Sequence, residues 1–152
     1  MTSKCILGFD IGGANTKAAL VTFNGSDLTK TYSCIDYFPF WEKTLNDIPD
    51  MLLRISNQIL SQSNFKIEDI DIIAIAITAE LSDAFETKRE GIFQILDALK
   101  KVFGEEKLRF ISTENKFLRF KEALSNWETI CAANWVSTAL YLGHFVEQGI
   151  LI

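Results

Sequence analysis

The chain has 152 residues, which suits one domain of ordinary size. Hydrophobic residues make up 48% and charged residues 23%, close to the globular average, so wholesale disorder is excluded. The formal net charge of −5 at pH 7 argues against a general nucleic-acid binder. No apolar run approaches the roughly 18 residues of a membrane helix, and we expect no signal peptide and no membrane contact. Three cysteines without a CxxC motif fit free thiols of a reducing compartment, which predicts a cytoplasmic protein.

Three strands are predicted in the first 38 residues. Residues 4–11 are apolar at nearly every position, as in a strand covered on both faces, and Gly12-Gly13 interrupts them. Residues 16–23 resume the apolar pattern, and Asn24-Gly25 after them is a hairpin signal. Residues 29–38 are β-branched and aromatic, which is typical of a third strand. Together these runs predict an antiparallel meander.

The rest of the chain alternates between helical and strand-like spacing. Helices are predicted from about residue 46 or 47 to 60, over 92–103 with Gly104 as the stop, over about 121–127 and over about 130–146. Strands are predicted over 71–78, over 108–112 and from residue 149 onward. The order β-β-β-α-β-α-β-α describes an α/β fold with a mixed five-stranded sheet. This is the ribonuclease-H-like lobe that actin, sugar kinases and Hsp70 ATPases share.

The pattern near the carboxyl terminus favours a two-lobed protein. We expect residues 1–128 to form an amino-terminal lobe and residues 129–152 to supply a crossing helix and a first strand toward a missing second lobe. In the alternative, the last residues add an edge strand to this domain. An exposed interlobe face would require the second lobe, a partner subunit or a second copy of the chain as a homodimer.

Residues 8–17 carry the strongest chemical signal. Asp10 comes at the end of a buried strand, and two glycines without side chains let backbone N–H groups approach an anion. Asp10 is the candidate metal residue, since a single carboxylate orients Mg²⁺ through water. The predicted phosphate-binding residues of the loop are Gly12, Gly13, Asn15, Thr16 and Lys17. The spacing is neither a Walker A loop nor a Rossmann fingerprint, and a plain glycine hairpin remains the alternative.

Three segments together resemble one family. They are residues 6–19 with the Asp-Ile-Gly-Gly-Ala-Asn-Thr-Lys core, residues 78–91, and Ala132-Ala-Asn-Trp135. They span nearly the whole chain and are similar to the methanofuran-pathway synthases. These are hydantoinase/oxoprolinase-like proteins of the actin-like ATPase superfamily, also labelled "tetrahydromethanopterin-linked C1 transfer pathway protein".

The resemblance implies a transferase reaction. Such a synthase joins an aminomethyl-furan diphosphate to the phenol of γ-glutamyltyramine, forms an ether and releases diphosphate. It implies Mg²⁺ and a small-molecule diphosphate substrate, because the site must stabilise charge on the leaving group. Family members continue with a second phosphate loop and a second lobe, so we expect this chain to be inactive alone. The alternatives are a lobe of an ATP-dependent kinase or hydantoinase/oxoprolinase, which would bind ATP, and a non-catalytic interaction lobe.

The segment 78–90 follows a buried strand, where loops face a ligand crevice. With the resemblance, we expect Thr78 and Arg89 to bind phosphate. We expect Asp10, Glu80 and Lys88 to be catalytic, with Glu80 as a base or as a magnesium residue through water. In the alternative, Asp83 or Thr87 caps the next helix and the segment is a solvated acidic loop.

Asn134 is a possible substrate contact. It lies within an apolar stretch, where an amide side chain must find hydrogen-bond partners. We therefore expect Asn134 to bond a neighbouring loop or to reach the ligand crevice.

Overall fold

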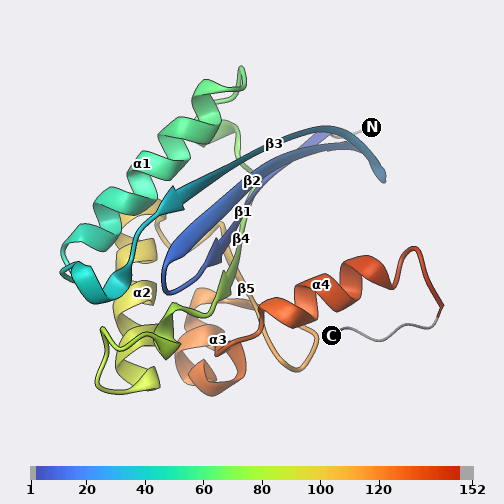
Figure 1. Ribbon diagram of the computed structural model, residues 1–152. Helices are drawn as coiled ribbons and strands as arrows, with labels where there is room; N and C mark the ends of the chain where they lie inside the picture. The colour runs from blue at the N-terminus through green and yellow to red at the C-terminus, as the bar shows by residue number, and fades with distance from the viewer. Residues whose placement is uncertain (1–2, 148–152) are drawn as a thin grey trace.

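A six-stranded mixed sheet forms the centre of the computed structural model, which describes residues 3–147 (Figure 1). The spatial order of its strands is β3-β2-β1-β4-β5-β6. Their bounds are β1 Ser3–Ile11, β2 Asn15–Asn24, β3 Asp27–Tyr37, β4 Ile72–Ile77, β5 Leu108–Ile111 and β6 Phe117–Arg119. β2 is antiparallel to β1 and β3, whereas β4 and β5 run parallel to β1. This arrangement is the ribonuclease-H-like fold, which confirms the predicted fold class.

The sixth strand is an addition to the five that the sequence predicted. β6 has three residues and pairs antiparallel with β5, so that Ile111 faces Phe117. Asn115 has a φ of 61° in the turn between them, a left-handed conformation that asparagine tolerates well. Because β6 is short and has no apolar run, only its pairing with β5 makes it a strand.

Helices cover the two faces of the sheet unequally (Figure 1). The helix bounds are α1 Asp47–Ser61, α2 Lys88–Phe103, α3 Phe120–Ser125 and α4 Asn134–Leu142, and short 3₁₀ turns span Phe40–Glu42, Ile67–Asp69, Ala79–Leu81 and Trp127–Ile130. The large apolar core lies between α1, α2 and one sheet face. A small apolar cluster lies under α4 on the other face of the sheet. It consists of Ala76, Ile111, Ala133 and Val136. The second face is therefore the more open one.

The helix predicted over 130–146 is wrong in its extent. A 3₁₀ turn ends at Ile130, a turn follows, and α4 runs only from Asn134 to Leu142. Cys131 forms a parallel bridge with Ile77, and Ala132 has a φ of 47°, so the backbone there is not helical. The strand predicted from residue 149 lies outside the described residues. Within residues 3–147, no helix is long and apolar enough to cross a membrane.

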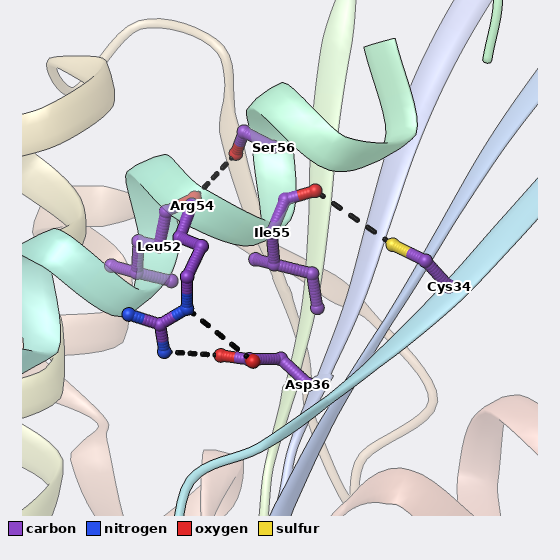
Figure 2. A network of polar contacts seen from close by, with 6 residues as sticks. All are labelled: Cys34, Asp36, Leu52, Arg54, Ile55 and Ser56. Carbon is purple, nitrogen blue, oxygen red and sulfur yellow. Dashed lines mark hydrogen bonds and ion pairs between the residues drawn. The ribbon is translucent and has the colours of Figure 1, made fainter. Parts of the chain in front are cut away.

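Polar contacts dock α1 onto β3 (Figure 2). The Arg54 guanidinium donates to both oxygens of Asp36, and the Cys34 thiol donates to the carbonyl of Ile55 at 3.7 Å. The Ser56 hydroxyl donates back to the Leu52 carbonyl at 2.6 Å within α1. These bonds supplement the burial of the apolar side of α1, which supplies most of the attachment.

Removing the Arg54–Asp36 pair is expected to change stability little. The Arg54 side chain is 52% exposed, so water screens the pair, and we expect Arg54→Ala to lower the free energy of unfolding by less than about 1 kcal/mol. Urea denaturation measures this, with Gln58→Ala, an exposed position of the same helix, as the matched control. A loss of more than about 2 kcal/mol relative to that control would contradict the view that burial holds α1.

Candidate functional site

The turn between β1 and β2 forms the predicted phosphate loop. The Gly12 N–H donates to the Asn15 carbonyl at 3.1 Å and closes the turn. A Cβ on residue 12 would lie only 2.9 Å from that same carbonyl oxygen. Glycine is therefore required at position 12 because any side chain would open the turn.

Two backbone hydrogen bonds join the segment after β3 to this loop. The Phe40 N–H donates to the Gly13 carbonyl and the Phe38 N–H to the Ala14 carbonyl, each at 2.9 Å. In the described part of the chain, the N–H groups of Gly13 and Ala14 themselves have no hydrogen-bond partner. Two adjacent amides in a fixed loop are suited to an anion, as in other backbone nests.

Asp10 and Lys17 face each other across β1 and β2. They are register partners, and the Lys17 ammonium lies 3.1 Å from Asp10 Oδ2. The other oxygen, Asp10 Oδ1, is buried and has no partner among the described residues. One free carboxylate oxygen beside the predicted phosphate loop is the kind of group that can hold Mg²⁺ through water. No group of three or more metal-ligating side chains occurs in residues 3–147, so a cage made by the protein alone is not formed there.

Thr16 lies on the opposite face from Asp10 and Lys17. Successive residues of a strand point to alternate faces, and Thr16 is completely buried on the side of α1 and α2. Its Oγ1 has no partner among the described residues. The structure therefore does not bring the Thr16 hydroxyl to the side where Lys17 projects, contrary to the expectation that both would bind the same phosphate.

A pocket of about 790 Å³ lies between the open sheet face and α4. Asp10 and Lys17 line it together with Asn134 and Tyr141 of α4. Its sheet side includes the small residues Gly8, Ala19, Ala74 and Ala76. Asn134 is the first residue of α4, and its Oδ1 accepts from the Trp135 N–H at 2.9 Å. The predicted substrate contact thus shares a pocket with the predicted metal residue.

Thr78 joins the second motif to the phosphate loop. Its N–H donates to the Ile11 carbonyl at 2.9 Å, which continues the pairing of β4 with β1 beyond the strand end. Its Oγ1 would lie 3.6 Å from a Cβ on Gly12, so the hydroxyl sits directly against the loop. The structure therefore brings Thr78 next to the loop.

Glu80 is a buried carboxyl at the same edge of the sheet. It is 2% exposed, and its Oε1 accepts from the Ala132 N–H at 2.8 Å, while Oε2 is buried with no partner among the described residues. Burial raises the pKa of Glu80, and the Ala132 hydrogen bond and the charge of Lys88 oppose this only in part. Burial, with a contribution from Glu80, raises the pKa of the Cys131 thiol to about 11. Glu80 does not line the pocket that contains Asp10.

Lys88 and Arg89 begin α2 and are exposed. Thr87 caps this helix, since its Oγ1 accepts from the Glu90 N–H at 3.1 Å, as one reading of the sequence predicted. The Arg89 guanidinium lies over the Phe93 ring at 5.3 Å. Neither basic side chain lines the pocket with Lys17, so the structure brings neither Arg89, predicted to bind phosphate, nor Lys88, predicted to be catalytic, to that pocket.

Polar atoms without partners gather at one edge of the sheet. Within residues 3–147, the buried side-chain oxygens that have no hydrogen-bond partner belong to Asp10, Thr16, Glu80 and Ser112. All four residues lie at or next to the carboxyl ends of β1, β4 and β5. The sequence analysis did not identify Ser112 as a site residue. Only its position at the end of a strand could have indicated it. Unsatisfied buried oxygens are costly, so their concentration here marks the edge where a ligand, water or another chain segment belongs.

Comparison with known proteins supports the resemblance of the motifs. No protein-family model matches the chain. A protein of Methanocaldococcus jannaschii, named (4-{4-[2-(gamma-L-glutamylamino)ethyl]phenoxymethyl}furan-2-yl)methanamine synthase, is 33% identical over 147 residues. The chain resembles this synthase. The match covers 97% of the chain and 39% of the synthase, so the chain spans well under half the length of this relative.

Solved structures show weaker similarity to the chain. An Aquifex aeolicus protein of the Ppx/GppA family has a TM-score of 0.45 at 12% identity, covering 68% of this chain and 33% of that one. YeaZ from Pseudomonas aeruginosa has a TM-score of 0.41 at 15% identity, covering 69% and 42%.

Proposed function

We propose that this chain is the amino-terminal lobe of a methanofuran-pathway synthase and supplies the loop that binds the departing diphosphate. The similarity to the synthase of Methanocaldococcus jannaschii over 97% of the chain supports this assignment. In this proposal residues 1–128 form the lobe, and residues 129–152 lead to a second lobe.

One observation carries the proposal: the three family-like motifs meet at the carboxyl edge of the sheet. Gly12 of the first motif lies against Thr78 of the second. Glu80 of the second motif binds Ala132 of the third. Segments far apart in the sequence therefore converge where ligands bind in open α/β sheets.

The proposed reaction is an alkyl transfer. The phenol oxygen of γ-glutamyltyramine bonds to the methylene carbon of the furan, and the carbon–oxygen bond to diphosphate breaks. The electron pair leaves with diphosphate, and the phenol proton passes to a base. Because negative charge grows on the leaving diphosphate, donors already in position accelerate the step.

In this proposal, three groups of the chain serve that task. The free N–H groups of Gly13 and Ala14 would donate to diphosphate oxygens, and Lys17 beside Asp10 would add positive charge. The free Oδ1 of Asp10 would hold Mg²⁺ through water. When bound, Mg²⁺ supplies further positive charge to the leaving group. These residues bind and orient; none of them forms a bond to the substrate.

The apolar surface of α4 supports a covering lobe or partner. The exposed large side chains in and after this helix are Trp135, Leu140, Tyr141, Leu142, Phe145 and Val146. An apolar patch of this kind marks an interaction surface. A second lobe or a separate subunit would cover it, and the isolated chain would be inactive because its site is incomplete.

A chimeric enzyme tests the proposal. Residues 3–147 would replace the matched segment of the Methanocaldococcus jannaschii synthase, with the unaltered synthase as control. We expect diphosphate release that requires both the furan diphosphate and γ-glutamyltyramine, and none from the chain alone. A folded chimera that ignores these substrates but consumes ATP would overturn the proposal in favour of an ATP-dependent enzyme. A folded chimera inactive in both assays would favour an interaction lobe.

A further inference from the structure

The turn at residues 131–133 has a conformation that its own sequence does not favour. Ala132 has a φ of 47°, in the left-handed region that a residue with a Cβ rarely adopts. Cys131 bridges to Ile77, and Ala133 is fully buried beside Val136. Contacts from elsewhere must hold such a turn, because local preference opposes it.

Glu80 supplies one of these contacts from 52 positions away. Its Oε1 accepts the Ala132 N–H at 2.8 Å, at the very residue with the unfavourable φ. This bond links the 3₁₀ turn after β4 to the turn before α4. Breaking this bond is costly on the side of Glu80, because its buried carboxyl would then lose its partner.

Gly91 of α2 packs closely against Glu80. A Cβ on residue 91 would lie 2.8 Å from Glu80 Cα and 3.0 Å from Glu80 Cβ. The helix thus packs directly against the backbone of residue 80. The backbone of Glu80 therefore has no room to move toward α2.

We propose that Glu80 is a positioning residue that acts on the pocket through Ala132. Two residues after Ala132, Asn134 begins α4 and lines the pocket with Asp10 and Lys17. Releasing the turn would therefore move Asn134 and α4 relative to those two side chains. The carboxyl of Glu80, 2% exposed and outside the pocket, is placed to hold this geometry and not to touch the substrate. The significance of the pocket rests on the proposed function; the link between Glu80 and Ala132 does not.

The first test measures amide hydrogen exchange of Ala132 by NMR in the 152-residue chain. We expect Glu80→Ala to speed exchange of Ala132 about tenfold and to shift the Asn134 and Trp135 signals, as loss of one hydrogen bond would. Glu80→Gln keeps an acceptor oxygen and should restore the slow exchange. Glu86→Gln, an exposed glutamate of the same segment, is the matched control and should change nothing.

Glu80→Asp keeps the test decisive if the alanine variant does not fold. The shorter side chain retains the charge but withdraws the carboxyl from Ala132, so exchange should again be fast. Slow exchange at Ala132 in the alanine variant, or in the aspartate variant if the alanine variant does not fold, would overturn the proposal.

The second test titrates inorganic diphosphate with Mg²⁺ into the same variants. We expect the alanine variant to bind it more weakly and the glutamine variant to bind it as the original chain does. If the glutamine variant keeps slow exchange at Ala132 but loses diphosphate binding, the charge of Glu80 acts on the ligand and the positioning role is wrong. If the original chain binds no diphosphate, the role proposed for its loop in binding diphosphate fails. The exchange data still decide whether Glu80 holds the turn.

Discussion

Asp10→Asn in the chimeric synthase is expected to lower kcat about 100-fold, the scale seen when one charge-stabilising group is removed from an active site. Asparagine keeps the shape of the side chain but loses the negative charge that would hold Mg²⁺ beside the leaving diphosphate. The apparent Mg²⁺ requirement should rise at the same time. Steady-state kinetics over a range of Mg²⁺ concentrations measures both effects.

The fold should survive this substitution. Lys17, the partner of Asp10, is 59% exposed, so losing the pair should cost less than about 1 kcal/mol of unfolding free energy. Asp27→Asn, which removes an exposed charge at the start of β3, is the matched control for net charge. An unchanged kcat in a folded Asp10→Asn chimera would remove Asp10 from the mechanism.

Gly91→Ala is expected to lower the free energy of unfolding by about 1–3 kcal/mol, as overpacking in a tight interior does. The new Cβ would lie 2.8 Å from both Glu80 Cα and Phe85 Cδ2. A backbone atom cannot swing aside as a flexible side chain can, so α2 must shift. This cost outweighs the gain of about 1 kcal/mol that alanine brings to a helix interior. Urea denaturation of the 152-residue chain measures the difference.

Gly143→Ala provides the control for this prediction. Its Cβ would meet atoms no closer than 3.4 Å, and its φ of −60° is allowed for alanine. We expect little change in stability there. If Gly91→Ala were equally neutral, the close packing of α2 against Glu80 would be disproved, and with it the restraint on Glu80.

Strong periodicity made most of the fold predictable. The apolar run of β4 and the helical spacing of α1 and α2 were identified correctly, because burial selects apolar residues at every strand position or on one helix side. The positions of two turns were also predictable from their glycines. Gly25 and Gly104 have φ values of 65° and 73°, which explains why glycine stands at the hairpin and at the end of α2.

The candidate site was predictable only in part. Asp10, Lys17 and Asn134 do share a pocket, and Thr78 does meet Gly12. Thr16 and Lys17 were both assigned to the phosphate site because they open the strand after the glycine turn, but neighbours in a strand point to opposite faces. Arg89 was assigned from its charge and position, yet it lies over Phe93 outside the pocket.

The sequence by itself determined β1 to β5, the two long helices and the glycine turn between β1 and β2, since each depends on spacing or on the conformational freedom of single residues. Only the tertiary structure decided where α4 begins, that β6 is a strand, and that Glu80 binds Ala132. These features depend on contacts between segments far apart in the sequence: the Ile77–Cys131 bridge, the pairing of β6 with β5 and a hydrogen bond across 52 positions. Their stability comes from burial and hydrogen bonds that form only when the sheet has formed. No local pattern in the sequence therefore predicts them.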